Sequence, residues 1–360
     1  MAIYEIGSSF GVEYEFNSFD IDGHWPPKKS DLRGWSLTRD GSCTKRGLEV
    51  DGIRLEVDRG DSLLDILPSR QVGGELVSPV YSKLTSAKFR EDIQALTKLL
   101  KRYGEYLSTL TSVHVHVYMG TLPPVEVIKN ILEIATRIEA PMFRLSVAEL
   151  LYHRGISHND YMYCRPLTGA GPQYVKDGNE HWRQCFDVDR IIMYANSTEE
   201  VLQAWGRADQ QRSKWIPPRY YWLNPVPLLR QGTIEFRCFN QTLDFKNVEA
   251  WVHLCLAVVR AAYAKPVELD IPRFPLGKTY EDYTLEDLLA VVPMEDYTLD
   301  KLYRLWSKSD WQLGVQGPQI NHLCRNQSAY VNLEAMDSRL VPPVVDREFI
   351  RSIWDNGYYD

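Results

Sequence analysis

Apolar residues alternate with polar ones, many of them ionisable, in four short segments of this 360-residue chain. The segments are FGVEYEF (Phe10 to Phe16), GELVSPV (Gly74 to Val80), SVHVHVY (Ser112 to Tyr118) and TIEFRCF (Thr233 to Phe239), with the weakest alternation in the second. Successive residues of an extended strand face opposite sides, so each segment predicts a strand with one apolar and one polar face. The polar faces would carry Glu13, Glu15, Glu75, His114, His116, Glu235 and Arg237.

If the four strands share a sheet, its polar face gathers four carboxylates, two imidazoles and one guanidinium. Carboxylates that lie close together raise one another's pKa unless cations compensate their charge, and bound metal would supply that compensation. Carboxylate oxygens with one or two imidazoles suit Mg²⁺ or Mn²⁺, whereas zinc sites use more histidine or cysteine. Each motif alone has a simpler explanation: a solvated face for ExE, exposed or hydrogen-bonded histidines for HxH, and a cross-strand ion pair for ExR.

Helical patterns lie between the predicted strands and must position them. Apolar residues recur at helical spacing over Ser86 to Tyr103, Pro124 to Leu151 and Glu199 to Trp205. Trp251 to Ala264 is apolar on almost all sides, which predicts a buried helix. Half-polar strands alternating with helices favour an α+β fold whose sheet has one polar face.

Two regions differ from this alternating pattern. The segment from Ser18 to Trp35 contains two prolines and predicts a long loop after the first strand. Beyond Ala264, the sequences EDYTLEDLL and EDYTLDKLY repeat with a fourteen-residue period. Each copy offers a threonine N-cap followed by an acidic residue, so we expect two short helices.

The overall composition excludes several classes of protein. Forty-one Lys and Arg against 48 Asp and Glu give a net charge of −7, so a nucleic-acid partner is not expected. The apolar runs fall short of the roughly 18 residues that a membrane span needs, and the first ten residues do not resemble an export signal. Six widely spaced cysteines without a CxxC pair predict free thiols. We therefore expect a soluble, cytoplasmic protein without a membrane partner.

In order along the chain, seven motifs resemble those of the amidoligase family, which is similar to glutamine synthetase and gamma-glutamylcysteine synthetase. Each motif is weak alone, but their shared order over Phe10 to Asp244 is specific. The motifs are Phe10 to Asn17 (FGVEYEFN), Asp40-Gly41-Ser42, Gly74 to Pro79 (GELVSP), His114 to Val117 (HVHV), Tyr163 to Leu167 (YCRPL), Arg219 to Asn224 (RYYWLN) and Gly232 to Asp244 (GTIEFRCFNQTLD).

The resemblance implies a curved, mostly antiparallel sheet with helices on one face, like the catalytic domain of glutamine synthetase. It implies a catalytic domain over residues 1–264 and leaves residues 265–360 as a helical extension packed on it, with no role assigned beyond packing or an oligomer contact. ATP and Mg²⁺, or Mn²⁺ in its place, are the implied cofactors. The partners would be a small-molecule or peptide carboxylate and an amine donor.

The resemblance also implies roles for individual residues. The metal ligands would be Glu13, Glu15, Glu75, His114 and Glu235. His114, His116 and Arg237 would contact the nucleotide, Glu235, Arg237 and Arg219 would be catalytic, and Arg165, Arg219 and Asn224 would bind substrate.

The implied activity is an ATP-dependent carboxylate-amine ligase that forms an amide or isopeptide bond through an acyl phosphate. Phosphoryl transfer depends on positioning and charge neutralisation, which metals and a planar guanidinium supply. Two alternatives stay open. One is a metal-dependent hydrolase in which His114, His116 and carboxylates activate water. The other is a non-catalytic nucleotide-binding protein on the same fold.

Overall fold

The structure is a computed structural model of the chain, and the parts of the chain that it describes contain the whole of the predicted sheet. The described residues are 6–20, 27–38, 48–50, 53–55, 70–82, 87–102, 111–146, 164, 167, 195–210, 221–242, 244–264, 284–294 and 299–307. The strands are β1 (Ser9–Asp20), β2 (Ser36–Thr38), β3 (Leu48–Val50), β4 (Ile53–Leu55), β5 (Arg70–Val77), β6 (Tyr81–Ser82), β7 (Ser112–Tyr118), β8 (Leu223–Asn224) and β9 (Thr233–Asn240).

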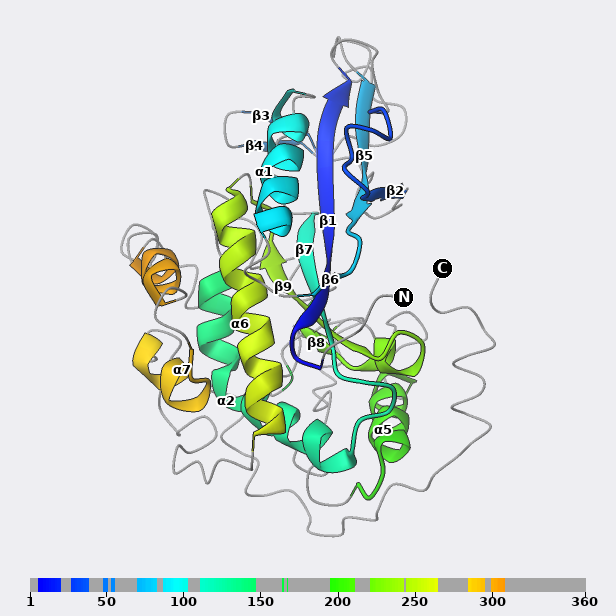
Figure 1. Ribbon diagram of the computed structural model, residues 1–360, viewed down its shortest axis with the longest axis vertical. Coiled ribbons are helices and arrows are strands. Elements are labelled where there is room, and N and C mark those ends of the chain that lie inside the picture. Colours follow the sequence, from blue (N-terminus) through cyan, green and yellow to red (C-terminus); the bar gives the residue numbers. More distant parts are fainter. Residues whose placement is uncertain are drawn as a thin grey trace, which may run out of the picture.

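Seven of these strands form one open sheet in the order β2-β5-β1-β7-β9-β8, with β6 paired to the start of β1. Every pairing in it is antiparallel, and β3 and β4 make a separate two-stranded ladder. The four predicted strands are therefore β1, β5, β7 and β9, and they are consecutive neighbours in the order β5-β1-β7-β9 (Figure 1). The expected α+β class with a mostly antiparallel sheet is confirmed, whereas likeness to the glutamine synthetase domain stays a prediction.

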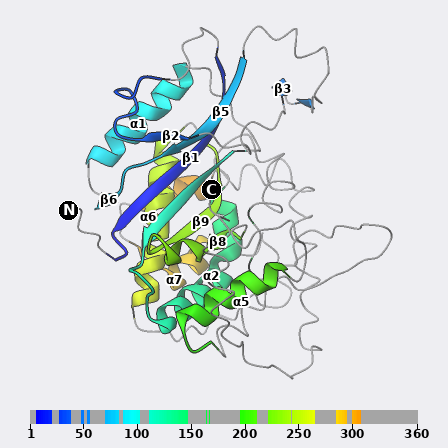
Figure 2. The same cartoon turned by 90° about the vertical axis from the view of Figure 1, so that its right-hand side faces the viewer.

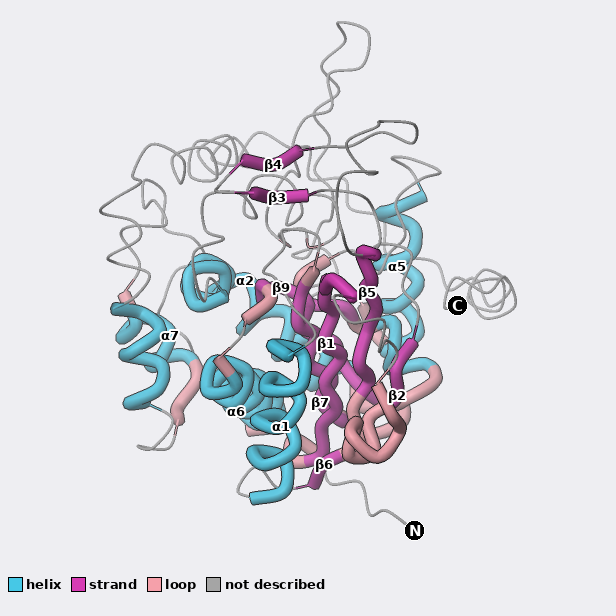
Figure 3. Tube along the Cα trace, turned by 90° about the horizontal axis from the view of Figure 1, so that it is seen from above, coloured by secondary structure: helices cyan, strands magenta, loops and turns pink. Residues whose placement is uncertain are grey.

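Three helices, α1 (Ala87–Arg102), α2 (Val125–Ser146) and α6 (Phe245–Tyr263), lie on the same side of the sheet (Figures 1 and 3). The helix α5 (Thr198–Gln210) contacts α2 near one end of the molecule (Figure 2). A short 3-10 helix, η4 (Val226–Leu229), lies between β8 and β9. All four predicted helices are present, within a few residues of their expected bounds except that α6 begins earlier, after the N-cap Asp244.

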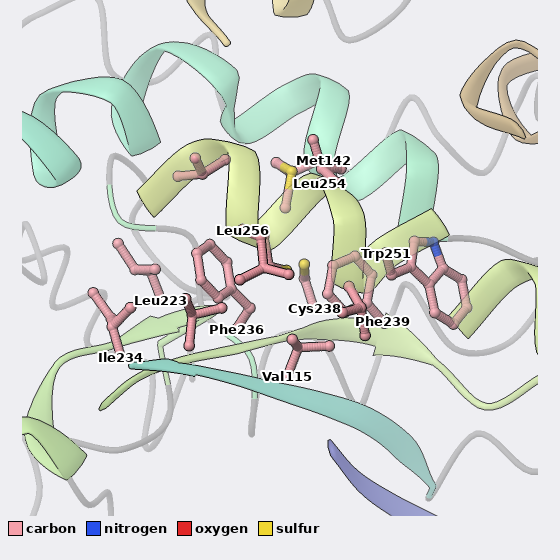
Figure 4. Packing of buried hydrophobic residues seen from close by; sticks show 14 of the residues in the cluster. Val115, Met142, Leu223, Ile234, Phe236, Cys238, Phe239, Trp251, Leu254 and Leu256 are labelled. Carbon is pink, nitrogen blue, oxygen red and sulfur yellow. The ribbon is translucent and has the colours of Figure 1, made fainter. Parts of the chain in front are cut away.

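The core lies between the apolar face of the sheet and helix α6. Val115 of β7 and Phe236, Cys238 and Phe239 of β9 point toward α6, whose Trp251 stacks on Phe239 at a centroid distance of 4.9 Å (Figure 4). Nearly every residue of α6 from Asn247 to Val259 is buried, which explains why its sequence is apolar on almost all sides. Packing on α6 buries the apolar face of each strand, whereas the side chains on the polar face stay available for binding and catalysis.

Two elements beyond Ala264 pack on the outside of this helix layer. Helix α7 (Leu285–Val291) contacts α2, and residues 299–307 form a further helical segment. The Thr284 side chain accepts a hydrogen bond from the backbone of Asp287, whose side chain in turn accepts one from the backbone of Thr284, as the capping-box pattern predicts. The second repeat's threonine, Thr298, lies outside the described residues.

The loop predicted from Ser18 to Trp35 differs from the structure at its start. Strand β1 continues through Asp20, because its pairing with β5 extends to the Asp20 and Arg70 positions. At the other end of the loop, Trp35 is buried and its indole N–H donates to the Tyr81 hydroxyl at 3.0 Å.

Among the described residues, no helix is both long and apolar enough to cross a membrane.

Candidate active site

The polar face of the sheet brings Glu13, His116 and Glu235 together from three adjacent strands. Strand β7 lies between β1 and β9, and His116 is the direct cross-strand partner of Glu235. One ligand atom from each of the three residues lies within 4.8 Å of the others, an arrangement that could hold a metal ion. The register of the three strands brings these residues together, because cross-strand partners lie on the same face of the sheet.

His116 is held by a contact at each ring nitrogen. Its Nδ1 lies 3.3 Å from the hydroxyl of Thr233, which in turn donates to Gln231 Oε1 at 3.3 Å. Since that hydroxyl uses its proton on Gln231, it accepts the Nδ1 proton of His116. The other nitrogen, Nε2, is buried and lies 3.1 Å from Glu13 Oε1, without the alignment of a hydrogen bond. Nε2 is therefore aimed among carboxylate oxygens and is the natural ligand atom of this ring.

His114, two residues away on the same face, joins a hydrogen-bond chain along β1 and β7. Its Nδ1 lies 3.1 Å from Glu13 Oε2 and 3.4 Å from Glu235 Oε1. Its Nε2 lies 2.8 Å from the hydroxyl of Ser112. That hydroxyl and the Ser112 backbone N–H both donate to Glu15 Oε2, at 2.6 and 2.8 Å. With the hydroxyl proton directed to Glu15, the serine accepts from His114, so both ring nitrogens donate and the imidazole is positively charged.

Glu235 has a cation on one oxygen and an amide on the other. Arg237 donates from Nη1 to Oε1, and Asn224 of β8 donates from Nδ2 to Oε2 at 2.6 Å. The amide oxygen of Asn224 accepts from the backbone N–H of Val226 at 3.1 Å, and Asn224 is only 2 % exposed. Asn224 therefore holds Glu235 in place, whereas the resemblance gave it a role in binding substrate.

A β-bulge in β9 lies next to Arg237. The register shifts between Val113 and Val115 of β7, which pair with Phe239 and Phe236, so two β9 residues face one residue of β7. Bulges re-aim side chains and are frequent next to active sites. The bulge also lets Phe239 join the core face, which strict alternation from Phe236 would not permit (Figure 4).

The two imidazoles have raised pKa values despite their burial. Burial lowers the pKa of His116, but the adjacent carboxylate of Glu13, 3.1 Å away, and the charge of Glu235 more than offset this and raise the pKa to about 9. Burial and Arg237 also lower the pKa of His114, and Glu15, Glu13 and Glu235 together bring it above its ordinary value.

The carboxylates respond in the opposite direction. Burial raises the pKa of Glu13, yet the charge of His116 and the hydrogen bond and charge of His114 hold it well below its ordinary value. Burial likewise raises the pKa of Glu235, but the Arg237 guanidinium and the histidines bring it below its ordinary value. Burial works against the charge of Arg237, but the carboxylates raise the pKa of its guanidinium, so it stays charged. Two ionised carboxylates, Glu13 and Glu235, thus lie beside one guanidinium and two imidazolium rings, and a cation bound at Nε2 would take the place of the His116 proton.

The remaining predicted site residues are distributed unevenly. Glu75 is the cross-strand partner of Glu15 and lies beside the cluster at the β1–β5 ladder. Arg165 and Arg219 lie outside the described residues, although their neighbours Cys164, Leu167 and Tyr221 to Asn224 are described. The group suited to a metal contains His116, whereas the resemblance assigned His114 to the metal and His116 to the nucleotide.

Sequence reasoning missed Ser112 and Thr233, the two hydroxyl residues that fix the histidine rings. Both begin the segments that alternate with period two, at positions where a strand could end, so nothing marked them as more than boundary residues. The sequence did contain a signal for Ser112, because this residue lies two positions before His114 and therefore on the same face of the strand. Thr233 likewise lies two residues before Glu235 and therefore on the same face of its strand.

The contacts from Ser112 through His114 to Glu13 also have the connectivity of a nucleophile, a base and an orienting acid. A nucleophilic serine must pass its proton to the histidine, yet Ser112 directs that proton to Glu15 at 2.6 Å. The described contacts therefore favour a structural role for Ser112. The cluster as a whole has the charge and the donors to hold a divalent cation and an anionic group beside it.

Comparison with known proteins gives one positive result. The model of the family described as "Putative amidoligase enzyme" matches residues 6–259, which include all four polar-faced strands, helices α1, α2 and α5, and most of α6. A search of curated proteins finds no match. The matched range ends within α6 and leaves α7 and the segment 299–307 beyond it.

Proposed function

Since this chain belongs to the amidoligase family, whose name denotes enzymes that form amide bonds, we propose that it is an ATP-dependent carboxylate-amine ligase acting through an acyl phosphate. The observation that carries the proposal is the meeting of Glu13, His116 and Glu235 beside the Arg237 guanidinium. A divalent cation next to a fixed guanidinium is the combination that phosphoryl transfer from ATP requires.

The residues present fit Mg²⁺ or Mn²⁺. Glu13 and Glu235 offer carboxylate oxygens, and the buried Nε2 of His116 lacks an aligned hydrogen-bond partner among the described residues. This oxygen-rich set with one imidazole is typical of Mg²⁺ or Mn²⁺. When bound, the cation would neutralise phosphate oxygens of ATP.

The protein's own residues supply the other requirements. Arg237 is held by Glu235 and its pKa is raised, so it presents a permanent positive charge to an anionic substrate group. Its planar fork suits the oxygens of a phosphoryl group and, later, the oxyanion formed when the amine attacks. His114 and Ser112 hold Glu13 and Glu15 from the side, so the carboxylates keep their positions as substrates exchange.

The hydrolase alternative has less support. Within the described residues the candidate metal group contains a single histidine, and hydrolytic metal sites generally use more. A non-catalytic nucleotide-binding protein would not require Arg237 and three carboxylates to be held so closely. The ligase is therefore the function that the site supports best.

ADP release in the presence of hydroxylamine tests the proposal without knowledge of the natural amine. Hydroxylamine attacks an acyl phosphate to give a hydroxamate, so a panel of amino acids, short peptides and dicarboxylic acids can be screened with it. We expect one member of the panel to give ADP and hydroxamate in equal amounts. Hydroxamate formation without ADP would support hydrolase-type acyl transfer instead, and ATP-independent cleavage of an amide substrate would contradict the ligase.

A further inference from the structure

A buried carboxyl group lies behind the candidate active site, on the helix layer. Glu139 of α2 is fully buried, and Ala135 and Met142 on the same face of the helix are fully buried as well. Glutamate is rarely fully buried unless it has specific partners. Two N–H groups donate to its Oε2: the indole N–H of Trp222 at 2.8 Å and the backbone N–H of Leu167 at 2.6 Å.

The first of these bonds connects Glu139 to Arg237 through Trp222. The backbone carbonyl of Trp222 accepts a hydrogen bond from the backbone N–H of Arg237 at 2.7 Å. The Trp222 ring packs against Phe236 of β9 with a centroid distance of 6.2 Å. Two residues after Trp222, Asn224 donates to Glu235. Trp222 therefore fixes residues 222–224. The backbone carbonyl of Trp222 contacts Arg237, and the side chain of Asn224 contacts Glu235.

The second bond ties another segment to the same carboxylate. Leu167 is buried, and Cys164, three residues before it, is 5 % exposed. Leu167 and Trp222 belong to separate motifs of the sequence, YCRPL and RYYWLN. One oxygen of Glu139 thus joins two segments from different parts of the chain, and the segment of Trp222 contacts the backbone of Arg237.

We propose that Glu139 is a positioning residue, which ties the segment of Cys164 and Leu167 to Trp222 and so keeps Trp222 in its backbone contact with Arg237. The catalytic part of this inference rests on the proposed ligase function. The positional part does not, because it concerns the protein's own segments. The contacts with Leu167 and Trp222 are the route by which Glu139 would act on Arg237.

Thiol labelling of Cys164 tests the positional part without any substrate. In the full chain, Glu139→Leu removes both acceptor contacts at nearly constant volume, whereas Glu139→Gln keeps a carbonyl oxygen that can accept both N–H groups. Trp222→Phe removes one donor and keeps an aromatic ring. Pulse labelling with N-ethylmaleimide, with each cysteine resolved by peptide mass spectrometry, gives a separate rate for Cys164 and for Cys255 of α6.

We expect Glu139→Leu to accelerate Cys164 labelling at least tenfold, with Trp222→Phe intermediate and Glu139→Gln within twofold of the parent. Cys255 is fully buried in α6 and should label at the parental rate in every variant. If Cys164 and Cys255 accelerate together, the substitution only loosens the whole fold, and the inference is overturned. An unchanged Cys164 rate overturns it as well.

The ADP-release assay tests the catalytic part. We expect at least a tenfold loss of turnover in Glu139→Leu and near-parental turnover in Glu139→Gln. An active parent whose Glu139→Leu variant kept full turnover would overturn the positioning role. If the labelling result holds but the parent itself releases no ADP with any acid, the failure belongs to the proposed ligase and not to the placement of these segments.

Discussion

Contacts from three strands converge on the side chain of Glu235. Arg237 of the same strand and Asn224 of β8 donate to its two oxygens, and the ring of His116 on β7 lies 3.9 Å from Oε1. A carboxylate in this position carries charge for a cation and at the same time fixes the guanidinium. Its loss should therefore affect chemistry far more than folding.

We predict that Glu235→Gln and Arg237→Ala each lower ADP release by at least about 100-fold, because each removes a fixed charge from the transferring phosphoryl group. Both variants should still unfold cooperatively, with thermal midpoints lowered by no more than about 10 °C. Calorimetry beside the ADP assay checks this. Lys98→Ala, which removes an exposed cation of α1, is the matched control and should behave as the parent. Near-normal turnover in either site variant would show the site assignment to be wrong.

The metal group can be separated experimentally from its neighbouring carboxylates. Glu13 belongs to the group of ligand atoms within 4.8 Å, whereas Glu75 lies at the adjacent ladder. We predict that Glu13→Gln weakens Mn²⁺ binding at least about tenfold, because a ligand carboxylate loses its charge. Glu75→Gln should weaken it less. Titration calorimetry with Mn²⁺ measures both, and an equal or larger effect of Glu75→Gln would favour the ligand set implied by the resemblance.

At this scale the sequence could predict residue types but not their partners. Strict alternation placed Glu13, His116 and Glu235 on polar faces, and the register now shows them to be neighbours. Alternation could not show which histidine joins the candidate metal group with Glu13 and Glu235, because His114 and His116 are equivalent in the pattern. The distinction arises from the neighbouring hydroxyls of Ser112 and Thr233, whose hydrogen bonds depend on the fold.

At the scale of elements, strand β9 and the turn that precedes it position Arg237. Gly232 directly precedes this strand with a φ of +66°, and its carbonyl accepts from the N–H of Met119 at 2.7 Å. A Cβ atom at Gly232 would lie 2.8 Å from a ring carbon of Tyr118 and 3.2 Å from the backbone of Gly120. Glycine is therefore required here by both conformation and space.

We predict that Gly232→Ala lowers the free energy of unfolding by about 2 kcal/mol, through backbone strain and the close contact with Tyr118. Gly11→Ala is the matched control on β1, because its added Cβ would meet Ser78 Oγ at an ordinary 3.6 Å. Urea unfolding of both variants measures the difference. Equal stabilities for the two variants would refute the strain at the β9 turn.

Helix α6 contains a buried histidine that makes folding sensitive to acid. Burial is the main reason that the pKa of His253 falls to about 4, and the charges of Lys301, Arg260 and Arg90 lower it further while Glu249 raises it. Above the unfolded value near 6.5 the ring is neutral in both states and costs nothing. As pH falls from 6.5 toward 4, the unfolded chain takes up the proton first, so stability is lost over this window.

We predict that His253→Gln reduces this loss by up to about 3 kcal/mol between pH 6.5 and pH 4. The lowered pKa of Glu249 acts in the same direction, because the stability that its charge contributes disappears as pH falls through its pKa in the folded protein. This contribution of Glu249 should persist in the His253→Gln variant. Urea unfolding of parent and variant at a series of pH values provides the comparison. Parallel pH profiles for the two proteins would contradict the role of His253.

Helices and strands were predictable because their apolar periodicities are long and regular. The extension of β1 to Asp20 was not, since FNSFD lacks the alternation of FGVEYEF and depends on pairing with β5. The β9 bulge at Arg237 was equally hidden, because it is a relation between two strands. Glu139 was a missed signal of another kind: an acidic residue on the apolar face of a helix, where burial requires a partner.

The whole molecule joins the family-matched region to helices beyond it. Glu249 of α6 is buried and pairs with Lys301 at 2.6 Å and with Arg90 of α1 at 2.5 Å. The Arg144 guanidinium of α2 lies 3.7 Å from the centre of the Trp306 ring. The contacts of Lys301 and Trp306 therefore join the region matched by the family model, which ends at residue 259, to residues beyond it. The division into a catalytic domain and an extension at residue 264 stays a prediction.

We predict that Lys301→Met lowers the free energy of unfolding by about 1–3 kcal/mol, because it leaves the buried Glu249 with one cation fewer. Turnover should change little, since Lys301 belongs to none of the contacts that build the candidate site. Lys98→Met on exposed α1 is the matched control for loss of a lysine charge. Equal stability of the two variants would mean that the segment 299–307 contributes little to the fold.

Nucleotide-dependent thermal stabilisation tests the central claim most directly, because it needs no knowledge of the acid or the amine. ATP with Mg²⁺ should raise the unfolding midpoint of the parent by several degrees, whereas Mg²⁺ alone or AMP with Mg²⁺ should not. The increase should be lost in Arg237→Ala and kept in Lys98→Ala. A parent that shows no response to ATP and Mg²⁺ would contradict the ligase function proposed for this site.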